Sequence, residues 1–189
     1  MPVTRAKLLQ APNLLTLTRV AVVPFFVAAF WLPSPALFWV TFALFAGASL
    51  TDWLDGWLAR RNDLGTEFGR FLDPVADKIL VAAALVMIVA SGRLSEISVV
   101  AVIILLVREL VISGLREFLA GALIVPVSQL AKWKTATQMA ATSILLISGA
   151  FANENRLLTI GECLLWLAAL LTIVTGASYL RGGLRHMDE

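Results

Sequence analysis

DWLDGWLARR (residues 52–61) and GRFLDPVADK (residues 69–78) place four aspartates between two apolar runs. The apolar run before them, 36–51, has 16 residues, and the run after them, 79–91, has 13. A helix needs about 20 residues to cross the hydrocarbon of a bilayer. Each of these two helices must therefore include its own pair of aspartates in order to span. We expect both pairs near one membrane face, on antiparallel helices joined by a link at residues 62–69.

The spacing of the aspartates predicts a shared pocket. Asp52 and Asp55 are three residues apart, and Asp73 and Asp77 are four apart, so each pair lies on one side of its helix. Carboxylates held together raise each other's pKa or require a cation, and their oxygens suit Mg²⁺ when the substrate carries phosphate. Alternatively, these are acids solvated at the membrane surface and paired with nearby basic residues. That interpretation fits one pair but fits two facing pairs poorly.

Composition predicts an integral membrane protein. The chain has 189 residues, 59% of them apolar, and a mean hydropathy of +0.87, which suits one membrane domain over 1–189. A net charge of +2 gives no support for binding nucleic acid. The only cysteine, Cys163, lies in an apolar run, and the only histidine, His186, lies near the end, so disulfides and histidine-based sites are not expected. Residues 1–12 are either an interfacial amphipathic helix or a disordered tail.

The fold expected is an all-α membrane protein with six transmembrane helices enclosing a polar cavity open to the cytoplasm. The predicted spans are 13–32, 36–60, 71–91, 97–118, 130–151 and 157–180, with tight turns at 33–35, 91–92 and 153–155. Ten Lys and Arg residues fall on the side of the termini and the aspartate link, and two on the other side. The positive-inside rule then places both termini and the active site on the cytoplasmic face of the inner (plasma) membrane.

Several cations lie where they could bind phosphate. Arg19, Lys78 and Arg108 fall inside or at the edge of spans, each in the cytoplasmic half, which indicates a site. An acceptor phosphate could bind a set of four cations on the fourth and fifth spans: Arg108, Arg116, Lys132 and Lys134. For Arg116 and the two lysines, anchoring at the membrane surface is an equal alternative. Glu109 is expected to point away from Arg108, because adjacent residues on a helix do not face each other.

The motif itself resembles that of a known family. The pattern D-x2-D-G-x2-A-R-x8-G-x3-D-x3-D, with every fixed position present here, is similar to that of the CDP-alcohol phosphotransferases. Three flanking segments, 13–19, 68–78 and 108–117, resemble the branch that uses CDP-diacylglycerol and sn-glycerol 3-phosphate. The resemblance extends over nearly the whole chain. It implies a phosphatidyltransferase of phospholipid biosynthesis that works among membrane lipids and forms a homodimer.

The resemblance also implies roles for individual residues. Asp52, Asp55 and Asp73 would bind one or two Mg²⁺ ions (or Mn²⁺ as a substitute), and Asp77 would complete the metal site and act as the general base. The CDP-diacylglycerol contacts would be Asn13, Thr16, Arg19, Gly56, Ala59, Arg60, Thr66 and Gly69. For Gly56, close helix packing is the alternative, and for Asn13 it is capping or anchoring of the first span. Metal, cations and a basic carboxylate together suit phosphoryl transfer.

Three other functions remain open at this point. Within the same family, inositol phosphate could replace glycerol phosphate as the acceptor. A prenyltransferase shares the metal chemistry but would need a second, distant aspartate motif, which this sequence lacks. A transporter would more naturally show repeated halves with broken helices, whereas this chain has one motif on one predicted helical hairpin.

Overall fold

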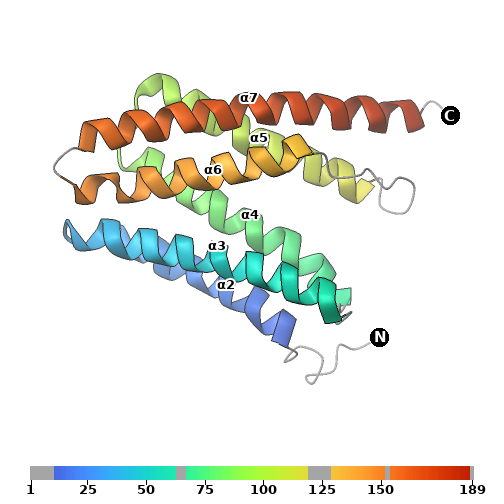
Figure 1. The fold of residues 1–189 in the computed structure, drawn as a ribbon, viewed down its shortest axis with the longest axis horizontal. Coiled ribbons are helices and arrows are strands. Elements are labelled where there is room, and N and C mark those ends of the chain that lie inside the picture. Colours follow the sequence, from blue (N-terminus) through green and yellow to red (C-terminus); the bar gives the residue numbers. More distant parts are fainter. Residues whose placement is uncertain (1–10, 63–66, 119–128, 152–153, 188–189) are drawn as a thin grey trace. The chain divides into compact units, whose positions relative to one another are not determined.

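The computed structural model describes residues 11–62, 67–118, 129–151 and 154–187 (Figure 1). Within these ranges, side chains are described for 17–51, 75–115, 129–151 and 154–180, apart from Arg19, Asp77 and Ser178. The described chain is helical, as predicted, and its elements are α2 (Ala11–Ala29), α3 (Ala36–Asn62), α4 (Glu67–Ala90), α5 (Glu96–Phe118), α6 (Gln129–Ile147), the short 3-10 helix η1 (Ser148–Ala150) and α7 (Glu154–Met187).

The two helices of the aspartate motif extend as the span-length argument requires. The 27 residues of α3 continue past the apolar run to Asn62, and the 24 residues of α4 begin at Glu67, well before the next apolar run. The prediction that both helices include their aspartates is confirmed. The predicted link was too long, because Gly69 already belongs to α4.

Of the other predicted boundaries, the turn at 91–92 agrees with the structure, whereas the two ends of α7 do not. The turn at 91–92 is present, and Gly92 has a φ of 66°, a conformation that glycine adopts without a steric penalty. By contrast, α7 has 34 residues and includes both Asn155 and His186, which were predicted to lie in a turn and in a tail. A helix satisfies its own backbone hydrogen bonds, and α7 carries arginines that favour helix beyond its apolar segment. It therefore does not end where the apolar run ends.

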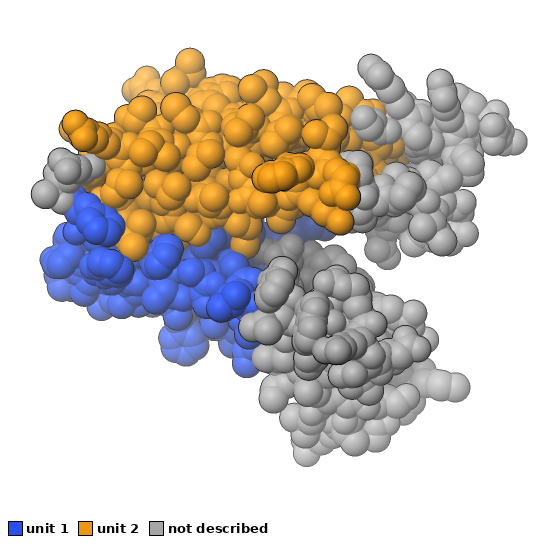
Figure 2. All heavy atoms as spheres, viewed as in Figure 1, with its two compact units in different colours: residues 1–87, 149–152 blue, residues 88–148, 153–189 orange. Residues whose placement is uncertain are grey.

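The chain divides into two compact units, coloured in Figure 2. The first contains residues 1–87 and 149–152, and the second contains 88–148 and 153–189. In the first unit α2 packs against α3, where Phe26 and Phe45 are fully buried. Trp39 at the start of α3 stacks at a tilt on Phe151, with ring centroids 5.8 Å apart, so the segment after η1 belongs to this unit.

The second unit is built on α7. Helix α6 runs antiparallel to α7 and packs along it, and α5 packs against α7 as well (Figure 1). Leu105 of α5, Leu145 of α6 and Leu165 of α7 are the largest fully buried apolar side chains described in this core. Gly161 brings α6 and α7 close, because a Cβ there would lie 2.7 Å from the side chain of Leu145. This core positions the polar residues described below.

The outward faces of the helices are strongly apolar. Leu110, Ile97 and Trp133 are each exposed over about two thirds or more of their surface. Among the described residues, the segments Glu96–Leu115 and Glu154–Ala177 are long and apolar enough to cross a membrane, and most of each segment is not buried within the protein. Contiguous apolar surface of this extent is unfavourable in water. These faces therefore indicate a protein associated with a membrane.

Candidate active site

The four aspartates of the motif occupy matching positions on two helices of the first unit. Asp52 lies ten residues before the last residue of α3, Asn62, and Asp77 lies ten residues after the first residue of α4, Glu67. The two inner aspartates, Asp55 and Asp73, are likewise nearly equidistant from the ends that the link joins. Both pairs therefore lie at similar distances along their helices from the link that joins them. Their side chains lie outside the described set, so their convergence on a metal stays a prediction.

The residues predicted to contact the nucleotide and lipid of the donor lie on α2, α3 and α4, apart from Thr66. Asn13, Thr16 and Arg19 are on α2, Gly56, Ala59 and Arg60 are on α3, and Gly69 is on α4, whereas Thr66 lies outside the described residues. Because α2 is helical from Ala11, the three-residue spacing of Asn13, Thr16 and Arg19 places their backbone positions along one side of it. Their side chains are not described, and among those that are, no group of three or more His, Cys, Asp or Glu could hold a metal ion. The metal-binding role of the aspartate motif stays a prediction.

A buried ionic cluster lies in the second unit, among α5, α6 and α7. The Arg108 guanidinium donates from Nη1 to Oε1 of Glu109 at 3.0 Å and from Nη2 to Oγ1 of Thr175 at 3.3 Å. The Lys134 ammonium donates to the same Oε1 of Glu109. The side chain of Lys134 is only 7% exposed, and those of Arg108 and Glu109 are 14% and 21% exposed. Two of the predicted acceptor residues, Arg108 and Lys134, are therefore brought together.

The expectation that Glu109 points away from Arg108 is wrong. Helical geometry directs the Cβ atoms of adjacent residues apart, but the arginine side chain is long enough to bend back to its neighbour's carboxylate. The partner that makes this conformation favourable is Lys134, which comes from another helix. A contact with α6 is a tertiary feature, and the local spacing rule does not include it.

A glycine on α7 leaves space for the side chain of Arg108. A Cβ at Gly176 would lie 3.3 Å from Cγ and 3.6 Å from Nε of Arg108, so the absence of a side chain lets the arginine pass close to α7. Within the described structure, the buried Nε–H of Arg108 has no hydrogen-bond partner. A guanidinium carries five N–H donors. Arg108 thus retains unused donor capacity in a nearly buried position.

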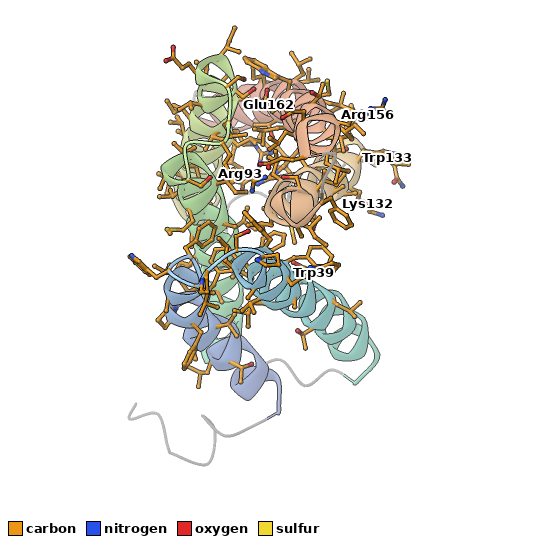
Figure 3. All side chains as sticks on the ribbon, turned by 90° about the vertical axis from the view of Figure 1, so that its left-hand side faces the viewer. Trp39, Arg93, Lys132, Trp133, Arg156 and Glu162 are labelled. Atoms are coloured by element: carbon orange, nitrogen blue, oxygen red, sulfur yellow. The ribbon has the colours of Figure 1, made fainter. Side chains whose placement is uncertain are left out.

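Of the other two predicted acceptor residues, only Lys132 has a described side chain, and it lies outside this cluster. Lys132 is exposed and points away from the helices of its unit, next to the outward-facing Trp133 (Figure 3). The side chain of Arg116 is outside the described set. For Lys132, the position beside an exposed tryptophan favours the alternative of anchoring at the membrane surface.

Sequence reasoning missed a buried polar stripe on the same helices. Gln138 and Thr142 follow Lys134 at intervals of four residues on α6, and both are buried. On α7, Thr172 is completely buried, and its hydroxyl has no partner among the described groups. The four-residue spacing of Lys134, Gln138 and Thr142 predicts one polar face on α6, so the sequence contained this signal. It continues the ionic cluster into the core of the unit.

A second polar cluster joins the other ends of these helices. Oε1 of Glu162 accepts from the Ser95 N–H at 2.7 Å, and Oε2 accepts from the hydroxyls of Ser95 and Ser98 at 2.8 and 3.0 Å. Glu162 of α7 thereby satisfies a free N–H at the start of α5. Close by in the chain, Arg93 points inward (Figure 3) and bonds Glu154 and Ser148. These contacts tie the start of α5 and the residues just before it to η1 and α7.

Comparison with known proteins extends the similarity over most of the chain. The family model described as CDP-alcohol phosphatidyltransferase matches residues 9–174. A Rickettsia bellii protein named CDP-diacylglycerol--glycerol-3-phosphate 3-phosphatidyltransferase is 44% identical over 171 residues, 90% of this chain and 93% of the relative. A Haemophilus influenzae protein of the same name is 44% identical over 174 residues, covering 90% and 91%. A rice protein named cardiolipin synthase (CMP-forming) is 41% identical over 191 residues, covering 93% and 57%.

Proposed function

The chain belongs to the CDP-alcohol phosphatidyltransferase family, and from this premise we propose that it transfers a phosphatidyl group from CDP-diacylglycerol to sn-glycerol 3-phosphate. The acceptor hydroxyl attacks the β-phosphorus of the donor. The bond between that phosphorus and the oxygen bridging to CMP breaks, and the products are phosphatidylglycerophosphate and CMP. The observation that carries the proposal is similarity over about nine tenths of the chain to relatives named for this reaction.

The donor diphosphate is assigned to the aspartate motif on α3 and α4. Four carboxylates at matching positions on two helices fit a hard divalent cation, so Asp52, Asp55, Asp73 and Asp77 would hold Mg²⁺, or Mn²⁺ in its place. When bound, the metal supplies charge neutralisation for the diphosphate and for the departing CMP. Asp77 removes the proton from the acceptor hydroxyl. The predicted donor contacts on α2, α3 and α4 bind the cytidine and the lipid headgroup.

The acceptor phosphate is assigned to the ionic cluster of the second unit. Arg108 and Lys134 both donate to the carboxylate of Glu109, so two cations from two helices lie close together in a largely buried position. Arginine and lysine side chains held together in this way suit a phosphate group, which accepts hydrogen bonds from both. The free Nε–H of Arg108 adds a donor for a phosphate oxygen.

The membrane arrangement forms part of the same proposal. The six helices span the inner membrane, both termini and the polar cavity face the cytoplasm, and a lateral opening leaves the acyl chains of the donor in the lipid. The apolar outer faces of the helices support the association with a membrane, and the distribution of basic residues supports the orientation. The homodimer is carried over from the family resemblance.

The acceptor is tested by an assay of the purified protein in lipid. CDP-diacylglycerol and Mg²⁺ are supplied with sn-glycerol 3-phosphate, with inositol 1-phosphate, or with phosphatidylglycerol, the last because a relative is named cardiolipin synthase. We expect CMP release and a phosphatidylglycerophosphate product with glycerol 3-phosphate. Turnover only with inositol phosphate or only with the lipid acceptor would reject this assignment, and transport without CMP release would reject the enzyme.

A further inference from the structure

The unusual feature of the ionic cluster is that both cations meet on one atom. Oε1 of Glu109 accepts from Arg108 on its own helix and from Lys134 on α6. The carboxylate therefore fixes the separation of two charged groups that come from different helices. Arginine and lysine side chains are long and flexible. To bind one small anion together, their charged groups must be held at a defined separation.

The α7 residues around Arg108 restrict its side-chain conformation without neutralising its charge. Thr175 provides a neutral hydroxyl, and that hydroxyl is itself fixed by its bond to the carbonyl of Leu171 at 2.8 Å. Gly176 provides space only. Neither residue carries charge, so the orientation of the guanidinium depends on Glu109 on one edge and on α7 on the other. The Nε–H edge remains unused.

We propose that Glu109 is a positioning residue, which holds Arg108 and Lys134 at the separation needed to bind the phosphate of the acceptor. This inference rests on the proposed function, because that proposal assigns the acceptor phosphate to the cluster. Glu109 itself does not bind the substrate, since a carboxylate repels phosphate. It orders the two cations before the anion arrives, which lowers the conformational cost of binding.

The first test compares kinetics of the full-length protein in lipid. Glu109→Gln should raise KM for sn-glycerol 3-phosphate about tenfold, equivalent to about 1.4 kcal/mol, and leave KM for CDP-diacylglycerol unchanged. Glu109→Asp keeps the charge but shortens the reach, and it should give an intermediate KM. If Glu109→Gln does not fold, the KM of Glu109→Asp for sn-glycerol 3-phosphate is the test. An unchanged KM for the acceptor in these variants would overturn the inference.

Glu162→Gln is the matched control. It removes the same charge from the same unit, but Glu162 contacts Ser95 and Ser98 rather than the cations. It should lower the thermal unfolding midpoint without changing KM for the acceptor. If Glu162→Gln raised that KM as much as Glu109→Gln does, the effect would come from general loosening of the helices, and the positioning role would be wrong.

The second test is binding without turnover. Inorganic phosphate or sn-glycerol 3-phosphate should raise the unfolding midpoint of the parent protein and of Glu162→Gln by roughly 2–4 °C, and that of Glu109→Gln by much less. Equal stabilisation of all three proteins, or none in the parent, would overturn the inference. The proposed function fails in a separate way: the parent would then release no CMP with glycerol 3-phosphate, even where phosphate stabilises it.

Discussion

Asp77 is the residue on which proton removal depends in the proposed reaction. Replacing it with asparagine keeps the shape of the side chain but removes the base, so Asp77→Asn should lower CMP release by roughly 10²–10⁴-fold. Folding and donor binding should remain largely intact, as measured by thermal unfolding with and without CDP-diacylglycerol. Asp52→Asn, by comparison, should weaken the metal dependence and donor binding together. Near-normal turnover in Asp77→Asn would place the base elsewhere.

Gly176 offers a second test at the scale of one residue. In Gly176→Ala the new Cβ would lie 3.3 Å from Cγ of Arg108, so the arginine must shift by a few tenths of an ångström. We expect KM for the acceptor phosphate to rise about threefold, because bidentate contacts depend on position. The matched control is Gly47→Ala, whose Cβ would meet nothing within 4 Å. An equal KM for the acceptor in both variants would contradict the inference that close packing of Arg108 against Gly176 matters for binding.

The sequence indicated candidate charged residues, of which the structure brings Arg108 and Lys134 together, but it did not indicate how they pair. Asp52 and Asp77 stand out because a carboxylate within an apolar run is energetically unfavourable and therefore indicates a functional role. Arg108 stands out for the same reason. Glu109 did not, because its role depends on Lys134, which is 25 residues away in the chain and comes from another helix. Contacts of this kind follow from helix packing, which no local spacing determines.

At the scale of the element, the close approach of α6 and α7 makes Gly161 sensitive to substitution. In a free helix face, Gly→Ala favours helix by about 1 kcal/mol. Here the new Cβ would lie 2.7 Å from the buried Leu145, so overpacking should dominate, and Gly161→Ala should destabilise the protein by about 1–3 kcal/mol. Thermal unfolding in detergent measures this. The double variant with Leu145→Ala should be destabilised by less than the sum of the two single variants, and an additive double variant would contradict the packing.

Helix lengths were predictable where membrane thickness constrained them. An apolar run of 16 residues is too short to span, which requires α3 to continue through Asp52 and Asp55, and it does. No such constraint acts at the end of α7. There the helix continues to Met187, beyond the predicted end at residue 180, because its backbone hydrogen bonds and its arginines favour helix without an apolar run. Apolar content locates a span but does not locate the end of the helix.

At the scale of the whole molecule, the distribution of basic residues predicts which loops are accessible from each side. In a Cys163→Ser background, single cysteines at Ser34 and Asn155 should react with an impermeant maleimide in intact cells. Cysteines at Leu64 and Ser128 should react only after the membrane is permeabilised. The contrast follows from ten basic residues on one side against two on the other. The reverse pattern would contradict the orientation and the cytoplasmic site.

The most direct test of the central claim is whether one metal site needs aspartates from both α3 and α4. Mn²⁺ binding to the purified protein with CDP is measured by electron paramagnetic resonance, with Mg²⁺ as the competitor. The account predicts saturable Mn²⁺ binding that Mg²⁺ displaces and that either Asp55→Asn or Asp73→Asn strongly weakens, because each helix supplies ligands to the same ion. Binding that survives both substitutions, or that depends on one helix alone, would contradict it.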